Sequence, residues 1–150
     1  MKPNAQLHTF LKPYDPRIRE LALQLRTFIT DTVPQANELI WDNYNAVAIA
    51  YSKTEQLKGA FCHIAVYAHH VNFGFNRGTE LPSSTLGLKG KGKHIRHLKV
   101  TDFQTFPKPE VEKLLLRAVA LSDADLPKNI EVVSAPKSMV MSISERKKRP

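Results

Sequence analysis

A run of short segments with alternating hydrophobicity, from residue 46 to residue 75, constrains the fold of this chain more than any other part of the sequence. Three of these segments have the period of two that is typical of β-strands: Ala46–Tyr51, Ala60–Tyr67 and Val71–Phe75. The connections between them are short and polar. A crossover helix needs a longer connection, so consecutive strands are predicted to run antiparallel.

The first of these strands has two unlike faces, because neighbouring residues of a strand point to opposite sides of a sheet. Val47, Ile49 and Tyr51 share one face. The other face carries three alanines: Ala46, Ala48 and Ala50. Small side chains leave room for close packing, so we expect a helix to lie against the alanine face.

Segments with helical periodicity lie on both sides of the strands in the sequence. Asp15 can cap a helix that has Pro16 at its first position, and apolar residues then recur at three- and four-residue spacing as far as Val33. The same spacing predicts a second amphipathic helix over Pro109–Leu121. Ala36–Trp41 is predicted to form a short helical turn that leads into the sheet.

The remaining segments complete the predicted fold. Ile95–Val100 is β-like and is predicted as a fourth strand, and Lys128–Ser134 as an edge strand or a docking arm. The basic tail Glu145–Pro150 is expected to be mobile. The order of elements indicates a single α+β domain over residues 1–150, with its core at about 14–122. We expect an antiparallel sheet of four to six strands that is packed on one face by the N-terminal and C-terminal helices.

The positive charge of the chain is concentrated in two places. The formal net charge is +8, of which Leu81–Thr101 contributes +5 without any acidic residue and the tail Glu145–Pro150 contributes +3. Clustered positive charge attracts phosphate groups, nucleic acids and acidic protein surfaces. Solvated surface lysines that only improve solubility would give the same pattern.

The sequence also indicates the compartment. Cys62 is the single cysteine, which excludes an internal disulfide and fits a reducing cytosol. No run approaches the roughly 20 apolar residues that a membrane helix needs, and the first residues lack the apolar core of a signal peptide. We therefore expect a cytoplasmic protein that does not enter a membrane.

The segment Gly87–His94 nearly matches the phosphate-binding motif G-x-x-x-x-G-K-[ST]. His94 replaces the Ser or Thr that holds magnesium, and the segment lies between a polar stretch and a β-like stretch, so a nucleotide hydrolase is disfavoured. Two interpretations of the glycines stay open. They permit an anion-binding nest of backbone N–H groups beside Lys91, Lys93 and Arg96, or they only shape a flexible turn.

No constellation of residues indicates catalysis or a metal centre. Cys62 lies in the middle of a strand among apolar residues, where a thiol is usually inert. His94 and His97 are predicted to point to opposite faces of one strand, and the adjacent His69 and His70 diverge. We therefore assign no catalytic residue, no metal ligand and no cofactor from the residues themselves.

The aromatic residues of the predicted strands have two interpretations. Tyr67, Phe73 and Phe75 would be either a base-stacking platform on an open sheet or the core beneath the helices. We favour the core, because an α+β layer must bury one face of its sheet. Nucleic acid is therefore a partner that we consider but do not favour.

Two motifs in the central region carry a family resemblance. They are A-V-Y-A-H-H-V-N-F-G-F-N-R-G-T-E-L, at residues 65–81, and G-L-K-G-K-G-K-H-I-R-H-L-K-V, at residues 87–100. Together with V-P-Q-A-N-E and Trp41 upstream, they resemble the YdhG-like family, a bacterial domain of unknown function, over roughly Pro16–Leu121. The resemblance implies a frataxin-like α-β sandwich. It also implies a role as an iron chaperone for iron–sulfur cluster assembly, with iron as the bound metal.

Our main functional hypothesis is a non-enzymatic binding module for an anionic ligand or an acidic partner protein, either as a monomer or as a dimer. Its binding surface is predicted to contain five basic residues: Arg77, Lys91, Lys93, Arg96 and Lys99. The alternative is a frataxin-like iron-binding protein. A third interpretation gives Gly92, Lys93 and Arg96 a purely structural role in fixing the loop.

Overall fold

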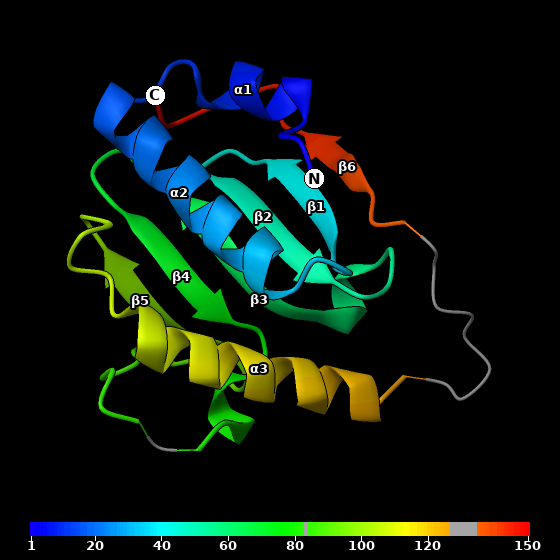
Figure 1. Ribbon diagram of the computed structural model, residues 1–150. Coiled ribbons are helices and arrows are strands. Elements are labelled where there is room, and N and C mark those ends of the chain that lie inside the picture. The colour runs from blue at the N-terminus through cyan, green and yellow to red at the C-terminus, as the bar shows by residue number, and fades with distance from the viewer. Residues whose placement is uncertain (83, 127–134) are drawn as a thin grey trace.

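The computed structural model describes residues 1–82, 84–126 and 135–150, and these residues form one mixed α+β fold (Figure 1). The described strands make a six-stranded sheet in the order β5-β4-β3-β2-β1-β6. Their bounds are β1 (Asn37–Asp42), β2 (Val47–Ser52), β3 (Ala60–Val66), β4 (Val71–Phe75), β5 (Arg96–Val100) and β6 (Ser138–Ile143). All neighbouring strands are antiparallel except β1 and β6, which are parallel. The predicted fold class is confirmed.

The helices of the described chain all lie on the same side of this sheet (Figure 1). They are α1 (Ala5–Leu11), α2 (Pro16–Thr32) and α3 (Lys108–Ala124). α2 begins where the sequence predicts, because Asp15 Oδ1 accepts a hydrogen bond from the Arg17 backbone N–H at 2.9 Å. α1 was not predicted; it is short and places Leu7 and Leu11 in the core. In the part of the chain that the structure describes, no helix combines the length and the apolar character that crossing a membrane requires.

The core lies between the helices and the sheet face that carries the larger side chains. Val47 and Tyr51 of β2 are completely buried there. Phe73 and Phe75 of β4 are also 0% exposed, and Phe73 packs edge-on against Phe28 of α2 with ring centroids 6.3 Å apart. Burial of each such side chain contributes about 1.5–3 kcal/mol. The aromatic residues of β4 therefore form the core and not a base-stacking platform.

The expectation of a helix against the alanine face is wrong for the described chain. Ala48 and Ala50 point away from α2 and α3, whose contacts are with the opposite face. The reason is area: helices bury more apolar surface against Val, Ile and Phe side chains than against alanine. We call the side without helices the open face, and its strand residues include Leu39, Trp41, Ala48, Ala50, His63, Ala65, Asn72, Gly74, His97, Lys99 and Met139. It points away from the viewer in Figure 1.

The segment that was predicted as a helical turn forms strand β1 instead. Every residue of β1 pairs with β2, and Glu38 is completely buried on the helix side. Its carboxylate is 2.7 Å from Arg26 Nε of α2, and it accepts hydrogen bonds from Tyr51 Oη at 2.8 Å and Ser138 Oγ at 2.7 Å. Burial, and then the Glu38 carboxylate, raise the pKa of Tyr51, so this hydroxyl keeps its proton and donates. Sheet pairing and this network outweigh the local helix propensity of the segment.

The C-terminal tail lies against the end of β1, although its charge predicted mobility. Arg149 forms an ion pair with Asp42 and donates from Nε to the Asn43 carbonyl at 2.9 Å. Lys147 Nζ lies 2.7 Å from the Asp42 carboxylate. The Arg149 side chain is only 4% exposed, so the tail is part of the packed structure. The predicted strand Lys128–Ser134 lies outside the described residues, and β6 was not predicted.

Candidate functional site

The five basic residues that were predicted to form one anion-binding surface lie in different surroundings. Lys91 and Lys93 are exposed in the loop that precedes β5. Lys99 is exposed on the open face. Arg77 and Arg96 are partly buried and bind groups of the protein itself. The two arginines and Lys99 therefore do not converge on one concavity.

Arg77 is held by two carboxylates. Its Nε and Nη2 atoms donate to the Glu80 carboxylate at 2.5 and 2.8 Å, and its Nη1 atom forms an ion pair with Asp125. Nη1 also donates to the Leu121 carbonyl of α3 at 3.2 Å. The hydrogen bonds with Glu80 raise the pKa of Arg77, and the same bonds lower the pKa of Glu80. Arg77 therefore joins the short 3-10 helix η2 (Gly78–Glu80) to α3, and its charge is compensated within the protein.

Arg96 binds carbonyl oxygens of its own loop. Its Nη1 atom donates to the carbonyls of Gly92 and Ile95, both at 2.7 Å. A Cβ added at Gly78 would come within 2.6 Å of Arg96 Cβ, so the loop approaches η2 closely at this glycine. An anion nest needs backbone N–H groups that point inward, whereas the groups around this guanidinium are acceptors. Of the two interpretations of the loop, these contacts fit a turn that is shaped around Arg96.

A different set of basic side chains comes together on the open face beside β5. Lys89 pairs with His97 in an isolated antiparallel bridge, with backbone hydrogen bonds of 2.9 and 2.8 Å. Directly opposed residues of such a pair share a face, and Lys99, two residues further along β5, shares it too. Lys89 and Lys99 are exposed and His97 is partly buried. We call Lys89, His97 and Lys99 the basic edge.

His63 of β3 adjoins the basic edge. His63 and His97 flank Gly74 in one row across the sheet, and the His63 ring occupies the place that a Cβ of residue 74 would take. The ring is oriented by Asn76, whose Oδ1 is 2.9 Å from His63 Nδ1. Burial lowers the pKa of His63, and the nearby His97 adds to this effect. The His63 imidazole is therefore neutral at pH 7.

His70, which precedes β4, lies on the other side of the basic edge. Its ring stacks on Tyr67 with centroids 5.0 Å apart. Burial lowers the pKa of His70, and the neighbouring Lys99 and His97 contribute next. At neutral pH, the lysines carry the positive charge of this surface.

The charge of the basic edge is uncompensated. None of the open-face strand residues in the described ranges is Asp or Glu. Over residues 1–82, 84–126 and 135–150, no carboxylate comes within ion-pair distance of Lys89 or Lys99. Several cations elsewhere are paired with carboxylates, as in Arg26–Glu38, Lys53–Asp123, Arg77–Glu80, Lys137–Glu55 and Lys147–Asp42.

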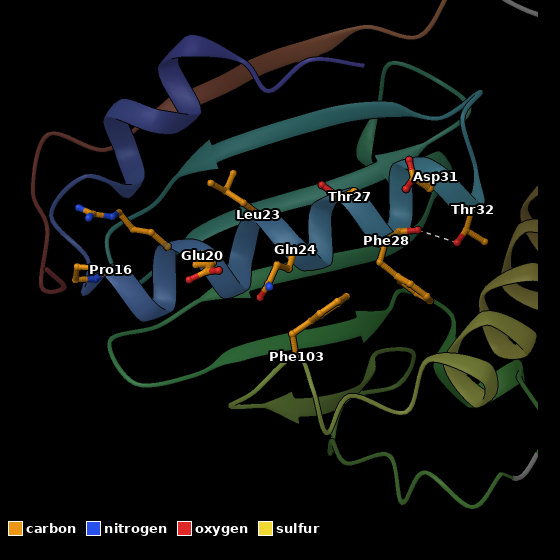
Figure 2. A pocket seen from close by; sticks show the side chains of 10 residues that line it. Pro16, Glu20, Leu23, Gln24, Thr27, Phe28, Asp31, Thr32 and Phe103 are labelled. Atoms are coloured by element: carbon orange, nitrogen blue, oxygen red, sulfur yellow. Dashed lines mark hydrogen bonds between the residues drawn. The ribbon is translucent and has the colours of Figure 1, made fainter.

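A groove of about 700 Å³ lies between α2 and the loop that follows β5 (Figure 2). Its lining includes the apolar side chains of Leu23, Phe28 and Phe103. Glu20 and Asp31 lie toward opposite ends of the groove (Figure 2). They are about 16 Å apart along the helix axis, which is too far for one metal ion. Within the described ranges, no group of three His, Cys, Asp or Glu side chains is arranged to hold a metal.

A second cavity, of about 640 Å³, has Arg77 in its wall together with Lys53 and Lys137. Lys53 pairs with Asp123 at 3.0 Å, and Lys137 pairs with Glu55 at 2.6 Å. These three cations are therefore neutralised by the protein, whereas Lys58, which also lines the cavity, has no ion pair in the described chain.

The single thiol of the chain, that of Cys62, is not placed to act as a catalytic nucleophile. Cys62 is 0% exposed, at the helix side of β3. Burial raises the pKa of Cys62 well above its usual value, so the thiol stays protonated and inaccessible.

The predicted surface includes Lys99 but not Lys89 and His97, which lie beside it in the structure. Alternation along β5 was a sufficient signal for one of them, since it places His97 and Lys99 on one face and Arg96 on the other. Lys89 had no such signal, because its position depends on a bridge across a turn that contains Gly90 at φ +143°.

Comparisons with protein-family models, with curated proteins and with solved structures found no match for this chain. The resemblance to the YdhG-like family stays a prediction, as does the frataxin-like role that it implies.

Proposed function

We propose that this protein is a cytoplasmic, non-enzymatic binding module whose basic edge binds an anionic ligand or an acidic partner. Lys89 and Lys99 provide the charge, and His97 lies between them on the same face. The exposed Lys91 and Lys93 extend the positive surface into the adjoining loop.

One observation carries this proposal: the basic edge gathers exposed lysines on a sheet face whose described strand residues include no carboxylate, whereas Arg26, Arg77 and Lys147 are bound to carboxylates. A cluster of like charges repels itself, and an anionic ligand would relieve this repulsion. The proposal therefore keeps Lys91, Lys93 and Lys99 from the predicted surface and replaces the two arginines with Lys89 and His97.

The proposal can be tested with a fluorescein-labelled oligoglutamate whose binding is followed by fluorescence anisotropy. We expect saturable binding that weakens when NaCl is raised from about 50 mM to about 300 mM, because salt screens exposed charges. The Lys89→Ala/Lys99→Ala variant should bind about tenfold more weakly, which corresponds to about 1.4 kcal/mol. Inorganic pyrophosphate, added as a competitor, separates a phosphate ligand from an acidic protein.

A matched control removes the same charge from the other side of the molecule. Lys113 and Arg117 are exposed on α3 and have no carboxylate partner in the described chain. The Lys113→Ala/Arg117→Ala variant should therefore retain affinity within about twofold. If both double variants lose the same affinity for oligoglutamate, the loss follows from net charge alone, and a site at the basic edge is contradicted.

A further inference from the structure

The open face has a floor of small side chains between two chemically different sides. One row across the sheet pairs Trp41 with Ala48, Ala48 with Ala65, Ala65 with Asn72, and Asn72 with Lys99. Adjacent strands are about 4.8 Å apart, so Trp41 and Lys99 stand about 19 Å from each other. We call the row of small residues between them, Ala48, Ala65 and Asn72, the trough.

The side chain that would obstruct this trough is turned away from it. His63 lies on the open face of β3, beside Ala65. Its ring lies over Gly74 of the neighbouring strand β4, toward the basic edge. Glycine at position 74 makes this orientation sterically allowed, because a Cβ there would collide with the ring. The His63 ring therefore lies on the Gly74 side of β3, and Ala48 and Ala65 are each partly exposed.

The two sides of the trough differ in polarity. On the β1–β6 side, Trp41 and Met139 are partly buried and pack against Leu39. On the β5 side stand the lysines of the basic edge, and no acidic strand residue of the described chain lies between the two sides. A ligand that fills the trough must therefore be apolar on one flank and anionic on the other.

We propose that the open face binds an amphipathic α-helix of an acidic partner protein. A helix is about 10–12 Å wide and fits within the roughly 19 Å between Trp41 and Lys99. Its apolar stripe packs on the alanine floor and Trp41, and its carboxylates face Lys89 and Lys99. This inference rests on the proposed function, to which it adds the class of partner and the manner of binding.

Charge complementarity selects this occupant over two others. A second copy of this chain carries the same net charge of +8 and would be repelled by the basic edge. A nucleic-acid strand would need aromatic or arginine side chains to stack its bases, and the trough offers Trp41 alone among its floor residues.

The test uses the fluorescence of Trp41, which is the single tryptophan of the chain. The probe is a synthetic peptide of about 18 residues with leucines on one helical face and glutamates on the flank, long enough for about five turns. We expect a saturable change in Trp41 emission on titration. A scrambled peptide of identical composition, which lacks the apolar face, should bind at least tenfold more weakly.

Two variants locate the helix. Ala65→Gln raises the floor without changing charge, and it should weaken the helical peptide at least tenfold while oligoglutamate binding stays within twofold. Lys99→Glu should also weaken the acidic peptide, and a peptide with lysine in place of glutamate should regain that affinity on this variant. The rescue cannot come from misfolding, so it keeps the test decisive even if Ala65→Gln reduces stability.

The possible outcomes separate the two proposals. If oligoglutamate does not bind the wild-type protein, the proposed function fails. If oligoglutamate binds but the scrambled peptide matches the amphipathic one, or Ala65→Gln has no effect, only the helix inference is overturned. Oligothymidylate that binds more tightly than the peptide and competes with it would identify the occupant as nucleic acid and would also overturn the inference.

Discussion

The two ends of the sheet use positive charge in opposite ways. At the β1–β6 end, Arg26 and Arg149 are almost completely buried and each binds a buried carboxylate. At the β5 end, Lys89 and Lys99 are exposed and have no carboxylate partner in the described chain. Buried pairs leave nothing for a ligand, and removing one partner is costly. Exposed, unpaired lysines contribute little to stability and keep their charge available for binding.

The largest expected effect comes from removing the buried carboxylate of Glu38 at the β1–β6 end. Glu38→Gln leaves the Arg26 guanidinium buried opposite a neutral amide and deprives Tyr51 and Ser138 of a charged acceptor. We expect the free energy of unfolding to fall by about 3–5 kcal/mol, measured by urea denaturation.

The exposed pair Lys137–Glu55 supplies the control for that measurement. Glu55→Gln should cost less than about 1 kcal/mol, because solvent screens the pair. A loss of similar size in both variants would show that burial does not separate the two ends of the sheet.

The next effect concerns the two basic residues of the β5 loop that the sequence treated alike. Arg96→Ala removes two hydrogen bonds to the carbonyls of Gly92 and Ile95, so we expect a loss of about 1–2 kcal/mol in unfolding free energy. Lys93→Ala removes only an exposed side chain and should stay within about 0.5 kcal/mol. If both variants lose the same unfolding free energy, the distinction between Arg96, which stabilises the loop, and Lys93, which is available to a ligand, is contradicted.

A smaller effect is expected from pH. The folded state lowers the pKa of His63 through burial, so the unfolded chain takes up a proton more readily than the folded one. Its contribution to stability is therefore present above the unfolded pKa of about 6.5 and is lost as the pH falls below it. We expect the Tm to decrease on acidification through this range, and to decrease less in His63→Gln. If the Tm of His63→Gln depends on pH as strongly as the Tm of the wild-type protein, other groups are responsible for the decrease.

The smallest expected effect is on the stability of the variant that tests binding. Lys89→Ala/Lys99→Ala removes two exposed, unpaired charges, so unfolding free energy should change by no more than about 0.5 kcal/mol. Combined with a tenfold loss of oligoglutamate affinity, this result would assign the lysines to binding alone. A loss above about 2 kcal/mol would instead indicate a structural role for the basic edge.

The elements that follow from local patterns were predicted, and those that depend on distant partners were not. The capping of α2 by Asp15 and the alternation from β2 to β4 are properties of contiguous sequence. The local sequence of β1 predicts a helical turn because Glu38 is helix-compatible. The residues that bind the Glu38 carboxylate, Arg26, Tyr51 and Ser138, are spread over more than a hundred residues. α1 and β6 were missed because one is short and the other depends on pairing with β1.

The candidate site shows the same division. Charge clustering in the sequence predicts a binding surface in this region, and Lys91, Lys93 and Lys99 are exposed there. The pairing of Arg77 with Asp125, 48 residues away in the sequence, has no local signal, whereas its other partner, Glu80, is in the next turn of the chain. Packing also decided which sheet face is covered. The alanines indicated room for a helix, but the larger apolar area on the other face attracted the helices of the chain.

The parallel pairing of β6 with β1 has a consequence for how the chain is assembled. Ser138 and Glu38 are 100 residues apart, so β1 keeps an unpaired edge until the chain as far as β6 has left the ribosome. Contacts between such distant segments form slowly, because the entropy cost of closing a long loop comes before the contacts stabilise the fold. The sheet is therefore completed last at β6. The interval before β6 arrives is the period in which nascent chains are most exposed to association through their β1 edges.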